Sequence, residues 1–223
     1  DTSYGMYLFP FYLTEVDPRN KQVIRKIWER MESLSLGSAA ESVSGAVADF
    51  DRLWKGYILA TMDVDPKDKR FPDVKNKWGK GPLELKDKHK FKVIKLSKEG
   101  TGSAVVILEG LDASYYKVVN NQQGPTAPAI TFDLRPLIRH AKVSIQAIVC
   151  YRDGRREYQD WTDFPERLFC LDKPADNFSS LYLVIACSED QRKLGGPIVE
   201  RLAISPEPSS RCRSGVVTLT RRF

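Results

Sequence analysis

Two runs of strand-forming residues constrain the fold more than any other feature of this sequence. Residues 143–151 alternate, and one face of this run carries Val143, Ile145, Ala147, Val149 and Tyr151. Residues 181–187 are apolar at nearly every position. Strict alternation predicts a strand with one face in a core, whereas a run that is apolar on both faces predicts a central strand between two layers.

Further short apolar runs, separated by turn residues, fill the chain from about residue 83 onward. The pair Asp153-Gly154 stands between two of them and is a strong β-hairpin signal. We count eight or nine short strands and no helix among them, with residues 216–220 as the last strand. This pattern predicts an antiparallel all-β sandwich over residues 83–223.

The first part of the chain has the spacing of helices instead. Asp17 is a good N-cap and Pro18 suits the first position of a helix. The apolar stripe that follows is expected to be buried, and its members are Val23, Ile24, Ile27, Trp28 and Met31. Prolines and glycines then mark a linker. The prediction is α+β by segments: a small helical subdomain at 1–66, a linker at 67–82 and the sandwich at 83–223.

Composition places the chain among ordinary globular proteins. Its 223 residues are 42% hydrophobic and 29% charged, which argues against disorder. No apolar run reaches the roughly 18 residues that a membrane span needs. The chain begins at Asp1 without a signal peptide or an initiator Met, so we expect a fragment of a longer protein.

Positive charge is concentrated in one segment. The net charge is +6, and residues 67–98 alone hold twelve Lys or Arg against four Asp or Glu. Within it Lys86, Lys88, Lys90 and Lys92 stand at every second position and form a possible polyanion contact. Lysine at every second position is also typical of a solvated edge strand. No nucleic-acid motif accompanies these lysines, so nucleic-acid binding is the weaker interpretation.

No motif in the sequence defines a reaction. The chain has two histidines, His89 and His140, and neither belongs to a recognisable nucleophile, zinc or phosphate-binding motif. We therefore predict no catalytic residue, no metal ligand and no cofactor. Tyr158, Trp161 and Trp78 are candidates for a ligand platform that stacks on a sugar, although aromatic residues near turns more often pack at the edge of a sandwich.

Four cysteines lie in the strand-rich half, and none forms a C-x-x-C pair. An even number suits either disulfides or buried thiols, and disulfides would indicate an oxidising compartment. Three pairings are possible. The order of the expected strands favours Cys150 with Cys170 and Cys187 with Cys212. On this basis we expect at least one disulfide within the sandwich and an extracellular or cell-surface location.

One resemblance covers most of the chain. Tyr4-Gly5, Leu8-Phe9 and Tyr12-Leu13, followed by the segment from Val23 to Glu29, are similar to the region after the metal site in secreted gluzincin-like zinc metallopeptidases and their inactive relatives. The resemblance implies a helical lobe followed by a C-terminal β-sandwich, and the segments 111–119 and 181–188 also look like that sandwich. It supplies no zinc ligand, because the family's H-E-x-x-H motif has no counterpart in this chain.

The leading functional hypothesis is a non-catalytic helical-plus-sandwich module of a secreted or surface protein. Such a module would bind a protein or a glycan, or would support a peptidase-like domain. The alternative is a fragment of an active secreted zinc metallopeptidase whose metal-binding half lies upstream. A weaker alternative is nucleic-acid binding through the lysine-rich strand.

Overall fold

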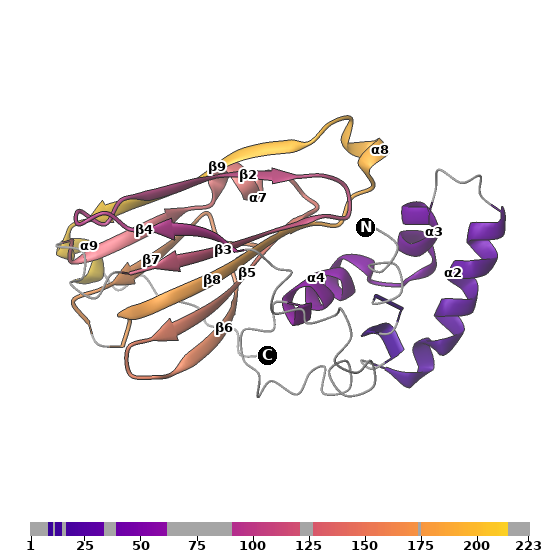
Figure 1. Ribbon diagram of the computed structural model, residues 1–223, viewed down its shortest axis with the longest axis horizontal. Coiled ribbons are helices and arrows are strands. Elements are labelled where there is room, and N and C mark those ends of the chain that lie inside the picture. The colour runs from indigo at the N-terminus through magenta and orange to yellow at the C-terminus, as the bar shows by residue number, and fades with distance from the viewer. Residues whose placement is uncertain are drawn as a thin grey trace.

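The computed structural model describes residues 9–10, 12–14, 17–33, 39–61, 91–120, 127–173 and 175–213. Within them a group of helices precedes two β-sheets that pack face to face, which confirms the predicted α+β sandwich (Figure 1). The linker at 67–82 and the strand at 216–220 lie outside the described residues. The predicted domain boundaries therefore stay a prediction.

In the helical part, the side chain of Asp17 caps the turn that follows it, as predicted. The backbone N–H of Arg19 donates to Asp17 Oδ1 at 2.9 Å. The helical elements are the 3₁₀ turn η1 (Pro18–Asn20) and the helices α2 (Lys21–Ser33), α3 (Ala39–Ala46) and α4 (Phe50–Thr61).

The first sheet has five strands in the order β1-β3-β8-β5-β6. Its strands are β1 (Lys92–Lys95), β3 (Ala113–Val119), β8 (Phe178–Cys187), β5 (Val143–Tyr151) and β6 (Arg156–Asp160). The pair β1 and β3 is parallel, and the other pairs of this sheet are antiparallel. Between β5 and β6, Gly154 takes a φ of +86°, which confirms the hairpin at Asp153-Gly154.

The second sheet has four antiparallel strands in the order β2-β9-β4-β7. They are β2 (Gly102–Leu108), β9 (Ile198–Glu207), β4 (Ala129–Asp133) and β7 (Glu166–Cys170). Among the described residues of this half, the short helices α7 (Arg135–Ile138) and α8 (Gln191–Leu194) lie between strands, and α9 (Ser209–Arg213) follows β9. The expectation of no helix in this half was wrong, because segments of four or five residues are too short to show helical periodicity.

Strand β5 shows why the sheets face each other. Its odd-numbered residues, from Val143 to Tyr151, are at most 6% exposed and belong to the core between the sheets, as their alternation predicted. On its opposite face, Ile148 is 2% exposed and packs into a second core with the helices. The first sheet is thus apolar on both faces.

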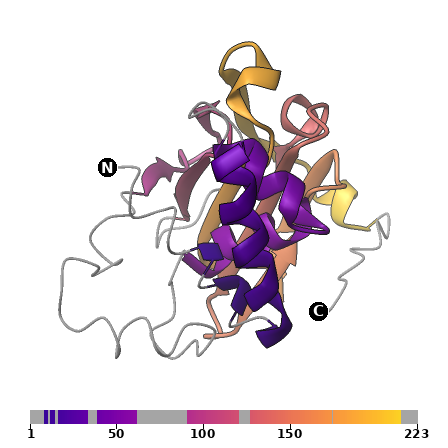
Figure 2. The same cartoon turned by 90° about the vertical axis from the view of Figure 1, so that its right-hand side faces the viewer.

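Strand β8 is the centre of a three-layer arrangement. Leu183 belongs to the core between the sheets, whereas Val184 and Ala186 belong to the core beneath the helices. This confirms the central strand predicted from a run that is apolar on both faces. Figures 1 and 2 show α4 next to the first sheet and α2 outermost. The layers are therefore the second sheet, the first sheet and the helices.

The expected burial of the α2 stripe was wrong at one position. Ile27 is 3% exposed, but Trp28 is 49% exposed. Successive residues of an α-helix differ by about 100° around the axis, so a helix that packs through a narrow face at Ile27 turns Trp28 aside. Val23 and Met31 are half-buried against the helical core, and Trp28 is not part of it.

Candidate functional site

The described residues hold no recognisable catalytic or metal centre. Within these ranges no group of three His, Cys, Asp or Glu side chains is placed to hold a metal ion. His140 bonds through Nε2 to Glu200 Oε1 at 2.8 Å, and Arg139 also pairs with this carboxylate. His89 lies outside the described residues. Of the described helices, none combines the length and the apolar character needed to span a membrane.

The predicted aromatic platform is not formed by its two described members. Trp161 is fully buried in the core between the sheets, where its ring lies 5.4 Å from that of Phe132. Tyr158 packs on the other side of the first sheet, against the helical core. A residue at 158 and one at 161 point to opposite faces of an extended chain, since the side-chain period of a strand is two. Trp78, the third member, lies outside the described residues.

Most of the predicted lysine surface also falls outside the described residues, which include Lys92 but not Lys86, Lys88 or Lys90. Lys92 is exposed on β1, and its Nζ lies 5.5 Å from the centre of the Tyr116 ring. One exposed lysine on an edge strand agrees with a solvated edge. The polyanion contact remains a prediction.

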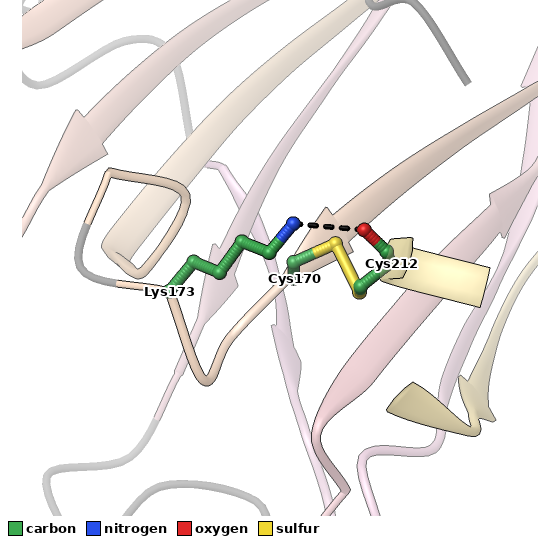
Figure 3. Close-up of a disulfide and its surroundings, with 3 residues drawn as sticks. All are labelled: Cys170, Lys173 and Cys212. Atoms are coloured by element: carbon green, nitrogen blue, oxygen red, sulfur yellow. Dashed lines mark hydrogen bonds between the residues drawn. A yellow bond between two sulfur atoms is a disulfide. The ribbon is translucent and has the colours of Figure 1, made fainter. Parts of the chain in front are cut away.

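A disulfide joins Cys170 at the end of β7 to Cys212 on α9, with their Cα atoms 5.8 Å apart (Figure 3). Lys173 Nζ donates to the carbonyl oxygen of Cys212 at 2.8 Å and holds the same helix. At least one disulfide within the sandwich is therefore confirmed. It is compatible with an extracellular location.

The preferred pairing of the cysteines was wrong, because the cysteines lie in different layers. Cys150 and Cys187 are free thiols. Cys150 packs against the helical core, and Cys187 belongs to the core between the sheets. Cys170 and Cys212 instead meet in a small cluster with Ala129 of β4. The sequence held no signal for this pairing, since it depends on where α9 crosses the second sheet.

The clearest polar feature of the interior lies at the flank where β6 and β7, the edge strands of the two sheets, come together. Gln159 of β6 and Arg167 of β7 are both 7% exposed. Gln159 Oε1 accepts a bond from Trp161 Nε1 and another from Arg167 Nη2, each at 2.9 Å. Interior-facing residues of a sandwich are normally apolar, so this polar group, which we call the β6–β7 network, stands out.

The β6–β7 network continues from Gln159 toward the surface. Gln159 Nε2 donates to Glu157 Oε2 at 3.1 Å, and Tyr151 Oη donates to the same oxygen at 3.0 Å. Burial and the neighbouring Glu157 carboxylate raise the pKa of Tyr151, so its hydroxyl stays protonated and acts as the donor. Arg155 pairs with Glu157 and lies 4.0 Å above the Tyr151 ring.

At its inner end the network holds the positive charge of Arg167, which Asp176 and Glu157 attract without a direct contact. Within the described residues Arg167 forms no ion pair, and its Nε–H is buried without a hydrogen-bond partner. Its guanidinium carbon lies 5.5 Å from the Trp161 ring and 5.2 Å from the Phe164 ring. Burial lowers the pKa of Arg167, although the group stays charged. Sequence reasoning missed this residue, but its position two residues before the buried Phe169 was a usable signal.

A second candidate is the outer helix with Trp28, which packs through Ile27 into the core that α4 shares with the first sheet. Lys55 Nζ of α4 lies 2.5 Å from Asp160 Oδ2 at the end of β6. Asp51 of α4 accepts bonds from Lys142 Nζ at 2.6 Å and from Ser188 Oγ at 2.7 Å. These contacts join α4 to the first sheet at two places.

Comparison with known proteins adds no relationship, because no family model, no curated protein and no solved structure matches this chain. The resemblance to gluzincin-like metallopeptidases therefore stays a prediction. The candidate sites in the described residues are therefore the β6–β7 network and the outer helix with Trp28.

Proposed function

We propose that this chain is a non-catalytic binding module of a secreted or cell-surface protein. The observation that carries the proposal is Trp28, which keeps 49% of its surface exposed on the outermost helix. A large exposed aromatic residue on a helix is a frequent anchor of protein–protein contacts, because Trp buries much area with few rotatable bonds. The sandwich and α4 serve as the scaffold that presents α2.

The chemistry of α2 defines the class of partner. The helix holds four basic residues (Lys21, Arg25, Lys26 and Arg30) and two acidic ones (Glu29 and Glu32), so its net charge is 4 − 2 = +2. Arg25 lies one turn before Trp28 and is 83% exposed at its side chain. The partner is thus a protein with an apolar pocket for Trp28 and acidic groups around it. A peptidase-like domain is one such partner and accords with the resemblance of residues 4–29.

The disulfide supports the secreted or surface setting of this proposal. Cys170–Cys212 fastens α9 to the second sheet, and disulfides of this structural kind persist mainly in oxidising compartments. The same bridge makes the scaffold resistant to local opening. It has no part in the contact with the partner, since it lies in the sandwich and not in the helical layer.

A binding array tests the proposal. The purified chain is applied to arrays of extracellular proteins and of glycans, beside the variants Trp28→Ser and Val199→Ser. Val199 is the matched control, because it is 56% exposed but lies on β9 of the second sheet. We expect the unaltered chain to be retained on a protein of the array. Trp28→Ser should abolish this retention, and Val199→Ser should leave it intact.

Four other outcomes contradict the proposal. Retention on glycans alone would show that the ligand is a glycan and not a protein. Retention on a protein that Trp28→Ser leaves unchanged would show that the partner binds to a surface other than the one around Trp28. Hydrolysis of casein by the chain in the presence of Zn²⁺ would favour the peptidase alternative. Steeply salt-dependent binding to duplex DNA would favour the lysine-rich strand.

A further inference from the structure

The chain carries one sequence motif that the protein-binding proposal does not use. Asn177-Phe178-Ser179 has the form N-x-S, with a residue other than proline in the middle. This is the acceptor motif for N-linked glycosylation, and none of the other four asparagines of the sequence stands in such a motif. A motif of three residues is common by chance, so its structural setting decides whether the asparagine is able to carry a sugar.

The structure places Asn177 directly before β8, at the end of a turn whose residues Lys173 and Ala175 are exposed. The backbone N–H of Asn177 donates to the carbonyl oxygen of Lys173 at 3.0 Å. The side chain of Lys173 in turn bonds to Cys212, the disulfide partner of Cys170 (Figure 3). The motif thus follows a surface turn that is tied to α9 and to the disulfide, which is the setting expected for an acceptor in a secreted protein.

The side-chain amide of Asn177 is oriented by the donors that face its oxygen. Oδ1 accepts from Arg152 Nε at 3.0 Å and lies 3.5 Å from Asn120 Nδ2. Arginine only donates hydrogen bonds, so the amide atom that faces it is the oxygen and not the nitrogen.

The amide nitrogen of Asn177 is consequently turned away from Arg152. Among the described residues, none accepts a hydrogen bond from this Nδ2. Asn177 is half-buried, and its Nδ2 is not one of the buried polar atoms that lack a partner, so this nitrogen reaches solvent. The atom that N-linked glycosylation modifies is therefore the accessible one, and the oxygen alone is used to hold the turn.

We propose that Asn177 Nδ2 is a site of N-linked glycosylation, and that the modifying group is an oligosaccharide transferred from a polyprenyl diphosphate carrier. Nδ2 forms a bond to the anomeric carbon of the first sugar, and the bond between this carbon and the diphosphate oxygen breaks. The lipid diphosphate leaves with the bonding electrons, and Nδ2 gives up one proton to solvent. This inference rests on the secreted setting in the proposed function, but not on the contact through Trp28.

A glycan at this place is compatible with the fold. Phe178 is fully buried in the core between the sheets, and the residues on either side of it point to the opposite face because side chains alternate along a strand. Ser179 on that face is exposed. In Figure 1 β8 begins at the end of the sandwich that carries α9, and α2 lies beyond the opposite end. The glycan therefore leaves the surface around Trp28 uncovered.

The test follows the whole chain in a cultured eukaryotic cell line, where an added signal peptide directs it into the secretory pathway. Intact mass is measured for the chain from the medium and from the cells, before and after treatment with a peptide N-glycosidase. We expect a mass that exceeds that of the polypeptide by one oligosaccharide. The glycosidase should remove this difference and convert the linked asparagine into aspartate, which peptide mass spectrometry would locate at position 177.

Single substitutions separate the acceptor motif from its neighbours. Ser179→Ala removes the hydroxyl that the motif requires and is expected to abolish the added mass, whereas Ser179→Thr is expected to keep it. Ser180→Ala is the matched control, because Ser180 is the next residue of β8 and lies outside the motif. The loss of the 3.1 Å bond from Ser179 Oγ to the carbonyl oxygen of Cys150 is a small change at an exposed position, so Ser179→Ala should fold.

Chain without added sugar in both the medium and the cells, added mass that survives Ser179→Ala, or its loss in Ser180→Ala would each overturn the assignment. Trp28→Ser is expected to carry the same oligosaccharide as the unaltered chain. A chain without sugar thus leaves the contact through Trp28 standing, and a failed protein contact on the array leaves the glycan standing.

Discussion

The ammonium of Lys55 lies 2.5 Å from the carboxylate of Asp160, and this pair joins helix α4 to the edge strand β6. Both side chains are mostly buried, at 25% and 20% exposure. Asp160 also accepts from Gln146 Nε2 at 2.7 Å and from Thr162 Oγ1 at 2.6 Å. The helical layer is thus held to the sandwich by polar contacts at its rim in addition to its apolar core.

Replacing one member of this pair should weaken the whole protein. Lys55→Met leaves the partly buried Asp160 carboxylate without its cation, and we expect a loss of about 1–3 kcal/mol in the free energy of unfolding. In urea titrations, Lys55→Met combined with Asp160→Asn should cost less than the sum of the two single changes.

Arg25→Met is the matched control for that experiment, because the Arg25–Glu29 pair is exposed by 83% and 55%. Exposed pairs contribute little, so this change should stay within about 0.5 kcal/mol. Additive costs for Lys55→Met and Asp160→Asn would show that the two side chains do not interact.

Acid should loosen the contact between α4 and the sheet. Burial opposes ionisation of Asp160, but the hydrogen bonds from Lys55 and Thr162 outweigh it and lower the pKa below 3.8. A carboxylate with a depressed pKa in the folded state stabilises the protein above its unfolded-state pKa, here near 3.8. That stability is lost as the pH falls through the folded-state pKa.

We therefore expect the unfolding free energy to fall as the pH drops below about 4. Asp160→Asn should make this fall shallower. Urea titrations at a series of pH values would measure this dependence for the unaltered chain and the variant. Identical acid dependence in the Asp160→Asn variant would refute the role of this carboxylate.

The disulfide should stabilise the sandwich. It closes a separation of 42 residues, for which the chain-entropy model gives about 4 kcal/mol. Cys212→Ser should lower the unfolding free energy by roughly 2–4 kcal/mol. Alkylation of the denatured chain without reductant should label two thiols, Cys150 and Cys187, as judged by intact mass. Four labelled thiols would show that the bridge does not form.

The helical layer should not fold by itself. Its core includes Ile148, Val184 and Ala186 of the first sheet, so removal of the sandwich exposes the aromatic cluster around Phe9 and Tyr57. We expect residues 1–66 alone to bind a hydrophobic dye and to melt without cooperativity. A sharp two-state melt of this fragment would mean that the layer is an independent domain.

Sequence reasoning succeeded where a signal was local. The alternation in β5 and the two apolar faces of β8 each follow from the pleat of a single strand, so their burial was readable without a partner. Gly154 marked its hairpin for the same reason, because a turn of this kind needs a residue that tolerates positive φ.

Sequence reasoning failed where the structure depends on contacts between segments that are far apart in the chain. Cys170 and Cys212 pair only because α9 returns across the second sheet, and a list of cysteines contains no such information. Trp28 has the spacing of a buried residue. It is exposed because α2 packs on the helical core through a narrow face that does not extend to position 28. Arg167 is intermediate, since its inward direction follows from Phe169 but its neighbours Gln159 and Trp161 come from another sheet.

The affinity of the chain for the protein selected on the array tests the central claim most directly. Surface plasmon resonance would compare the unaltered chain with Trp28→Ser and Val199→Ser. The account predicts a dissociation constant at least about tenfold higher for Trp28→Ser, since a buried Trp anchor is worth more than about 1.4 kcal/mol, and little change for Val199→Ser. Equal affinity of Trp28→Ser and the unaltered chain would contradict it.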